Sequence, residues 1–185
     1  MEELKVNTII GIDPGGAGGI AVQEPDGRVR VVKMPRDIAD LRDFLTHYRD
    51  NYAPIVFLEK LNVRPDDVFV EGDKAALGKL YRVQKMVANF EHLKAIIEAV
   101  GVPYILVHPM SWQAKLKLRV PGSGEEKRER KRRFARTAAE WYPNTRVTLW
   151  NADALLILSF GKWALENDLK WVRSNLPKRE HDKLF

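Results

Sequence analysis

The sequence contains no cysteine, which excludes disulfide bonds and thiolate metal sites. Any bound metal must therefore have oxygen or imidazole ligands, and oxygen ligands favour Mg²⁺ or Mn²⁺. The chain also lacks an apolar run of about 18 residues, and its start has no basic segment followed by an apolar one. These absences predict a cytoplasmic protein with no membrane partner.

Motifs for binding nucleotides are also missing. No Gly-Lys-Ser or Gly-Lys-Thr is present to form a P-loop. The spacing Gly16-x-Gly18-x-x-Ala21 imitates a dinucleotide fingerprint, but the residues that follow predict a strand where that fingerprint needs a helix. With 185 residues, 45% of them hydrophobic, the chain suits one core and is too short for the two-lobed cleft of actin-like kinases. We therefore expect a single domain over residues 1–185.

Positive charge is concentrated in one stretch of the chain. Ten Lys or Arg and three Glu lie between residues 115 and 136, and the net charge of the whole chain is +6. The remainder is therefore close to neutral. A localised basic segment is typical of contact with a polyanion, and the alternative is a solvated helix face. The flexible turn expected at residues 122–124 favours the first interpretation.

The hydrophobic pattern predicts a mixed α/β fold. Three strands read as a meander, and strands then alternate with helices; the expected strands are 5–13, 19–23, 28–34, 55–58 and 104–107. Asp37 is the expected cap of a first helix, a long helix is expected over 75–100, and a polar loop over 61–72. A turn through Trp112, a basic helix to residue 141 and a last helix from about residue 151 complete the pattern.

Three acids occupy positions that favour a metal site. Asp13 and Glu59 end buried strands, where an unpaired carboxylate costs several kcal/mol unless a cation or hydrogen-bond donors satisfy it. Asp153 lies in the first turn of an apolar helix, where compensation of the helix dipole is the alternative explanation. Together they favour a site for one or two divalent ions that activate water and stabilise the leaving oxygen of a phosphodiester.

Four segments in a fixed order carry further information: Gly-Ile-Asp-Pro-Gly at 11–15, Val-Phe-Leu-Glu at 56–59, Val-His-Pro-Met-Ser-Trp-Gln at 107–113 and Ala-Asp-Ala-Leu-Leu-Ile at 152–157. In this combination the chain resembles the RuvC-like Holliday junction resolvases of the ribonuclease H superfamily. The resemblance implies a five-stranded mixed sheet flanked by helices on both faces. It also implies a homodimer from a bacterial or phage-like setting that nicks four-way DNA junctions symmetrically with Mg²⁺ or Mn²⁺, two ions per active site.

The resemblance also implies roles for individual residues. By motif, Asp13, Glu59 and Asp153 are metal ligands, and a lysine, Lys115 or Lys127, lies near the scissile phosphate. The family usually has a fourth acid three or four residues before the helix aspartate, where this chain has Leu149 and Trp150. We therefore expect the neighbouring Asn151 to complete the metal shell, with the loop acids Asp66 and Asp67 as the alternative.

The candidate DNA-binding residues come from two segments. Those in or near the basic stretch are Lys115, Lys117, Arg119, Lys127, Arg128, Lys131 and Arg132. On the long helix, Tyr81, Arg82 and Lys85 either touch DNA or form its solvated face, and a wide apolar stripe suits a partner surface. Trp112 is expected in the core. A flap or general branched-DNA nuclease, a structure-specific ribonuclease and a catalytically silent junction-binding protein remain alternatives.

Overall fold

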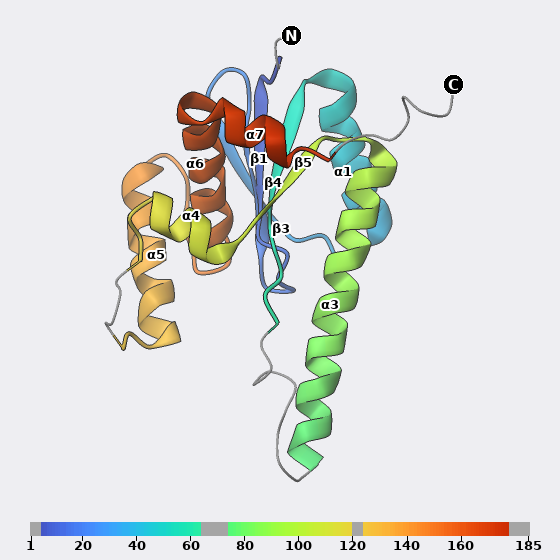
Figure 1. Cartoon of the computed structure of the whole chain (residues 1–185), viewed down its shortest axis with the longest axis vertical. Helices are drawn as coiled ribbons and strands as arrows, with labels where there is room; N and C mark the ends of the chain where they lie inside the picture. Colours follow the sequence, from blue (N-terminus) through green and yellow to red (C-terminus); the bar gives the residue numbers. More distant parts are fainter. Residues whose placement is uncertain (1–4, 64–73, 120–123, 178–185) are drawn as a thin grey trace.

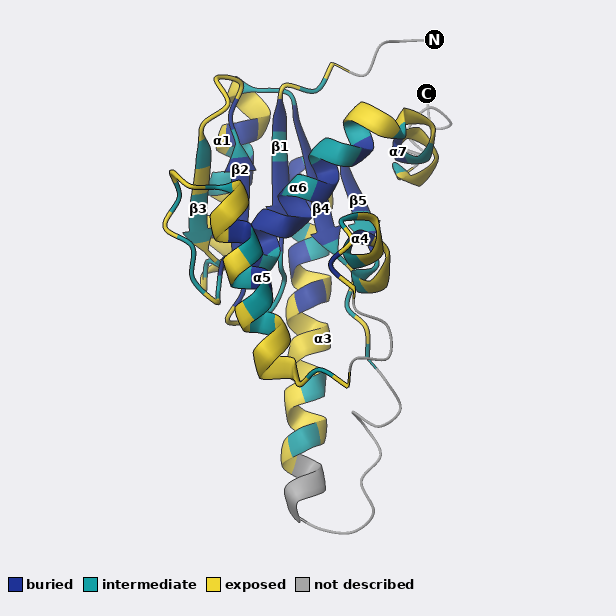
Figure 2. Cartoon of the chain, turned by 90° about the vertical axis from the view of Figure 1, so that its left-hand side faces the viewer, coloured by how far each residue is buried: buried dark blue, intermediate teal, exposed yellow. Residues whose placement is uncertain are grey.

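The computed structural model describes residues 5–63, 74–119 and 124–177. A five-stranded sheet lies at its centre (Figure 1), and the strand order is β3-β2-β1-β4-β5 (Figure 2). The first three strands form an antiparallel meander, and β1, β4 and β5 are parallel. The strands are β1 (Thr8–Ile12), β2 (Gly19–Gln23), β3 (Val29–Lys33), β4 (Pro54–Glu59) and β5 (Tyr104–Val107). The sheet is mixed, as predicted.

Helices cover both faces of this sheet (Figure 1). One face carries α1 (Ile38–Asn51) and α3 (Lys74–Val100). The other carries α6 (Ala152–Asn167), against which the other helices of the described residues pack: α4 (Pro109–Lys115), α5 (Lys127–Trp141) and α7 (Leu169–Asn175). This arrangement confirms the predicted fold class.

Strand alternation divides the core into two layers. Ile10 and Ile12 of β1 face α1 and α3, where they belong to one buried cluster with Leu45. Phe57 of β4 points the other way and joins the cluster around α6 and α5. The predicted cap of α1 is present, because the Asp37 side chain accepts a hydrogen bond of 2.7 Å from the Ala39 N–H. Local sequence pattern thus sets both layers.

Gly11 allows α6 to approach β1 closely. A Cβ atom at this position would lie 2.5 Å from both the Ala154 carbonyl oxygen and the Leu158 nitrogen, which are backbone atoms of α6. No residue with a side chain fits there without moving the helix. The close approach brings the first turn of α6, with Asp153, to the end of β1.

The long helix α3 extends well beyond the sheet (Figures 1 and 2). Its 27 residues correspond to about 40 Å at 1.5 Å per residue. From Phe90 onward it contributes buried side chains to the core. Before that point, four large apolar side chains are exposed: Leu80, Tyr81, Met86 and Val87. The predicted broad apolar stripe is therefore partly uncovered in the described chain.

The sequence-based prediction differs from the structure in one element. The helix α7 was not expected; it begins after Asp168, whose side chain accepts a hydrogen bond from the Trp171 N–H at 3.1 Å. This cap starts a new helix directly where α6 ends.

Most of the predicted loop 61–72, including Asp66 and Asp67, lies outside the described residues. Among the described helices, none is long and apolar enough to cross a membrane.

Candidate active site

The structure brings Asp13, Glu59 and Asp153 together at one edge of the sheet. Asp13 follows β1 and Glu59 ends β4, and these parallel strands are paired with Ile12 opposite Leu58, so the two acids share one sheet end. Asp153 joins them from the first turn of α6. All three line one cavity of about 380 Å³. Ligand sites commonly lie at this end of parallel strands.

Glu59 is held by a tryptophan. The Trp112 indole N–H donates a hydrogen bond of 2.9 Å to Glu59 Oε1, and the Trp112 ring is itself 1% exposed. The expectation that Trp112 belongs to the core is therefore confirmed. Burial, followed by the negative charge of Asp13, raises the pKa of Glu59 to about 8, and the Trp112 bond opposes this rise.

The pKa values of Asp13 and Asp153 are both raised. Burial raises the pKa of Asp13, against the Gly15 N–H, which donates a 3.1 Å hydrogen bond to Oδ1. Burial also raises the pKa of Asp153, and the charge of Asp13 adds to the rise. The positive charge of Lys131 lowers both pKa values. Three carboxyl groups that disfavour one another's ionisation form a cluster of the kind found at functional sites.

The basic helix α5 forms one wall of the cavity. Lys127, Arg130, Lys131 and Phe134 line it, at the i, i+3, i+4 and i+7 spacing that places residues on one helix face. Lys131 Nζ lies 3.6 Å from Asp153 Oδ2. Met86 and Phe90 of α3 also contribute to the lining. Acidic and cationic side chains therefore line the same cavity.

Asn151 is not brought to this cavity. Its side chain is fully buried in the turn before α6, where Oδ1 accepts a hydrogen bond of 2.7 Å from the Thr148 N–H. The Asn151 Nδ2 group donates a 3.0 Å hydrogen bond to the Arg146 carbonyl. Both polar ends of the amide are engaged within the chain. The expectation that Asn151 completes a metal shell finds no support in this arrangement, because its oxygen already has a partner.

The donor chemistry of the cavity fits a hard divalent cation. Three carboxylates are ligands that Mg²⁺ and Mn²⁺ accept, and a cation would offset their mutual repulsion. As the described side chains stand, however, no three acidic or histidine groups converge closely enough to hold an ion. Trp112 orients Glu59, and Lys131 lies beside Asp153. Lys131 thus occupies one oxygen of Asp153 that a cation would otherwise contact.

The other candidate DNA-binding residues are spread around the site. Lys115 lies away from the acids, with Nζ 4.9 Å from the ring centroid of Trp163. On α3, Lys85 Nζ lies 5.1 Å from the ring centroid of Tyr81, and Lys85 directly precedes the cavity-lining Met86. The remaining candidates are exposed and do not line the cavity: Arg82, Lys117, Arg119, Arg128 and Arg132.

Two contributions were missed at the level of sequence. Lys131 was predicted only as a DNA contact, yet it is the cation paired with Asp153, whereas Lys127 lines the cavity one turn away. Arg130 was not predicted, although its i+3 spacing from Lys127 was a usable signal. The bond from Trp112 to Glu59 had no such signal, because the two residues are 53 positions apart.

Comparison with known proteins supports the fold. No protein-family model and no curated protein matches the chain. RuvC of Thermus thermophilus in complex with a Holliday junction substrate aligns with a TM-score of 0.51 and 16% identity, over 87% of this chain and 96% of that chain. Another Thermus thermophilus RuvC structure aligns with a TM-score of 0.49 and 16% identity, over 91% of this chain and 98% of that chain. The predicted RuvC-like, ribonuclease H-like architecture is confirmed at the level of the fold.

Proposed function

We propose that this protein is a divalent-metal-dependent endonuclease that nicks four-way DNA junctions. The observation that carries the proposal is the meeting of three carboxylates from β1, β4 and α6 in one cavity whose wall is a basic helix. Acids alone would repel a phosphodiester, and a basic wall alone would only bind it. Their combination suits hydrolysis of a polyanion. The likeness of the fold to a RuvC structure with a Holliday junction substrate directs the proposal to branched DNA.

Each side chain has a role in this proposal. Asp13, Glu59 and Asp153 hold Mg²⁺ or Mn²⁺, two ions per site, which supply the activation of water and the stabilisation of the leaving oxygen. Trp112 holds Glu59 in place through the indole N–H. Lys131 neutralises Asp153 when no cation is bound and is free to contact a phosphate oxygen when one is.

The basic residues of α5 position the DNA backbone. Lys127 and Arg130 line the cavity, and Arg128 and Arg132 are exposed on the same helix. Neutralising phosphates releases counterions, so junction affinity falls steeply with salt concentration. Tyr81, Arg82 and Lys85 extend this surface along α3, beside the cavity.

Two symmetric nicks require two active sites, and we therefore include a homodimer in the proposal. The exposed apolar side chains on α3, among them Leu80 and Met86, support it. Sedimentation of the free protein and of its junction complex tests this step. A protein that stays monomeric on DNA and cuts only single flaps contradicts the junction proposal.

The decisive experiment is a cleavage assay with Mg²⁺ on four substrates: a four-way junction, a flap, a linear duplex and an RNA–DNA hybrid. We expect paired nicks in the junction, and loss of cleavage in Asp13→Asn. The matched control is Asp40→Asn, because Asp40 is an exposed acid in the first turn of α1. Preferred cutting of the flap would move the assignment to a general branched-DNA nuclease, and preferred cutting of the hybrid to a ribonuclease.

A silent junction-binding protein is the second candidate. Two observations favour it: the amide of Asn151 is engaged by Thr148, and no ready ion-holding group occurs among the described acids and histidines. Calorimetric titration with Mn²⁺ separates the two candidates. An endonuclease shows binding that Asp13→Asn removes, whereas a silent protein shows no binding that depends on Asp13.

A further inference from the structure

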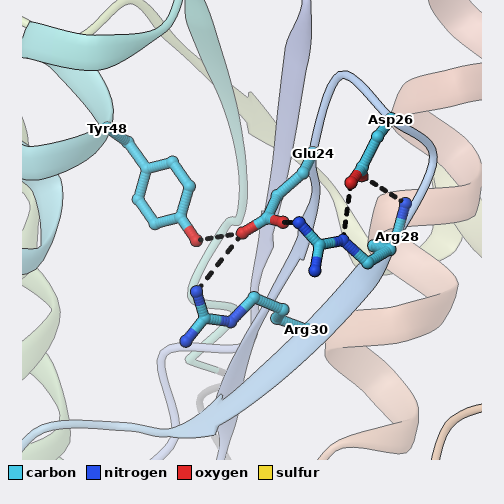
Figure 3. A network of polar contacts seen from close by, with 5 residues as sticks. All are labelled: Glu24, Asp26, Arg28, Arg30 and Tyr48. Carbon is cyan, nitrogen blue, oxygen red and sulfur yellow. Dashed lines mark hydrogen bonds and ion pairs between the residues drawn. The ribbon is translucent and has the colours of Figure 1, made fainter.

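The sheet end opposite the three acids carries a second polar network, centred on Glu24 (Figure 3). Glu24 follows β2, and only 9% of its side chain is exposed. Its Oε1 lies 3.3 Å from Arg30 Nη1 and accepts a 3.4 Å hydrogen bond from the Tyr48 hydroxyl. Its Oε2 lies 3.5 Å from Arg28 Nη2. One buried carboxylate thus anchors two guanidinium groups.

Both guanidinium groups remain accessible from outside. The side chains of Arg28 and Arg30 are 76% and 65% exposed. Asp26 also restrains Arg28, through a 2.6 Å contact between Oδ2 and Nε. Because the guanidinium is planar and its donors are fixed, such restraint reduces the freedom lost when an anion binds.

Four residues of this network, Glu24, Asp26, Arg28 and Arg30, line a cavity of about 1000 Å³ between the β2–β3 hairpin, α1 and the end of α5. It is separate from the acidic cavity, and no residue lines both. Besides the network, its walls carry aromatic, amide and basic side chains: Gln23, His47, Tyr52, Trp141, Tyr142, Asn144 and Lys162. The volume is ample for a ligand of several hundred Å³.

One basic side chain that lines this cavity has no acidic partner within the described chain. Lys162, half-buried on α6, forms no ion pair within the described chain. Glu24 and Asp26 are already matched by the two arginines, so Lys162 supplies excess positive charge. The cavity lining therefore has one cationic side chain more than its two acids neutralise.

Aromatic surface is available beside these groups. Trp141, at the end of α5, is 43% exposed, and Tyr52 and Tyr142 line the same cavity. An exposed ring next to a basic side chain suits a planar ligand that bears negative charge.

We propose that this cavity binds a nucleotide. Its phosphate contacts Lys162 and the outer edges of Arg28 and Arg30, and its base stacks on Trp141. A free nucleotide and a nucleotide within a single strand share this chemistry. The proposal does not rest on nuclease activity, because none of the three acids lines this cavity.

Calorimetric titration of the full chain without divalent metal tests the proposal, with deoxyadenosine 5′-phosphate as the probe. We expect saturable one-to-one binding that weakens with salt and is lost with deoxyadenosine, which has no phosphate. A parallel titration with a short single-stranded oligonucleotide distinguishes the source: tighter binding of the oligonucleotide identifies a strand site, and equal or weaker binding identifies a free-nucleotide site. Absence of saturable binding to either probe overturns the proposal.

Three variants locate the ligand. Lys162→Ala should weaken binding about tenfold, as expected for loss of a charged contact, and Lys170→Ala, an exposed lysine outside the cavity, should change it less than twofold. Lys127→Ala probes the acidic cavity. If Lys127→Ala removes binding and Lys162→Ala does not, the ligand lies at the other site and the proposal is wrong.

Discussion

The indole N–H of Trp112 donates a 2.9 Å hydrogen bond to Oε1 of Glu59 and joins the helix α4 to the end of β4. Because Trp112 is 1% exposed and its ring centroid lies 5.5 Å from that of Phe134, the indole is fixed before any ligand arrives. The bond opposes the rise in the pKa of Glu59 that burial causes. A core residue thus controls both the orientation and the ionisation of a site acid.

The first prediction concerns this bond. Trp112→Phe keeps most of the buried ring but removes the donor, so Glu59 becomes harder to ionise and less well oriented. We expect a higher Mg²⁺ concentration for half-maximal cleavage and a loss of about 1–2 kcal/mol in the free energy of unfolding. Cleavage against Mg²⁺ concentration and urea unfolding measure the two effects. Trp171→Phe, on the same side of the sheet, serves as the control and should leave the Mg²⁺ requirement unchanged.

The second prediction concerns pH. The folded-state pKa of Glu59 is about 8, against the usual 4.5, so the folded protein binds more protons than the unfolded chain between these values. Stability without metal therefore falls as pH rises from about 4.5 to about 8. Glu59→Gln cannot ionise and should therefore not show this fall in stability. Because one pKa unit corresponds to about 1.4 kcal/mol, the variant should gain on the order of a few kcal/mol at pH 9.

Urea unfolding at pH 4 and pH 9 in the presence of a chelator checks this expectation. At pH 4 the carboxyl group is protonated in both states, so this electrostatic gain should vanish. Glu140→Gln, an exposed position on α5, is the control. An equal gain at both pH values would point to packing and not to ionisation.

Local sequence patterns predict much of the fold. The bounds of β2 and β5 were predicted to the residue, and Asp37 caps α1 as expected, because alternation and capping depend on neighbouring residues. The sheet-end positions of Asp13 and Glu59 follow from the same patterns. The pairing of Lys131 with Asp153 does not, because the choice between lysines one helical turn apart depends on how α5 packs on α6. The hydrogen bonds that Asn151 makes inside its turn could not be read from spacing either, and its place in a metal shell stays a prediction.

The third prediction tests the close approach of α6 to β1. Gly11→Ala would place a Cβ atom 2.5 Å from two backbone atoms of α6, so the helix must move. We expect a loss of about 2–3 kcal/mol in the free energy of unfolding, together with lower activity because Asp153 shifts from Asp13. Gly78→Ala is the matched control: nothing lies within 4 Å of its Cβ position in α3, and helix propensity should add about 0.5–1 kcal/mol. If Gly78→Ala lowers the free energy of unfolding as Gly11→Ala does, the close approach of α6 to β1 is not the cause of the loss.

The fourth prediction concerns Asn151. In Asn151→Asp the donor to the Arg146 carbonyl becomes an acceptor in a fully buried turn. We expect a loss of about 2–3 kcal/mol in the free energy of unfolding, with no gain in Mn²⁺ affinity. Urea unfolding and calorimetry measure these quantities. If Asn151→Asp binds Mn²⁺ more tightly than the unchanged protein, position 151 belongs to the metal shell and the prediction is wrong.

The last prediction separates chemistry from DNA affinity with two adjacent residues of α5. Lys131 lies beside Asp153 in the cavity, whereas Arg132 is exposed on the helix surface. With saturating junction, Lys131→Ala should lower the cleavage rate at least about tenfold, a loss of about 1.4 kcal/mol of transition-state stabilisation. Arg132→Ala should weaken junction binding and reduce its salt dependence while leaving the saturated rate within about twofold. Single-turnover cleavage and binding titrations at two salt concentrations distinguish these effects, and a reversal of the two patterns would move the phosphate contact from the cavity to the outer face of α5.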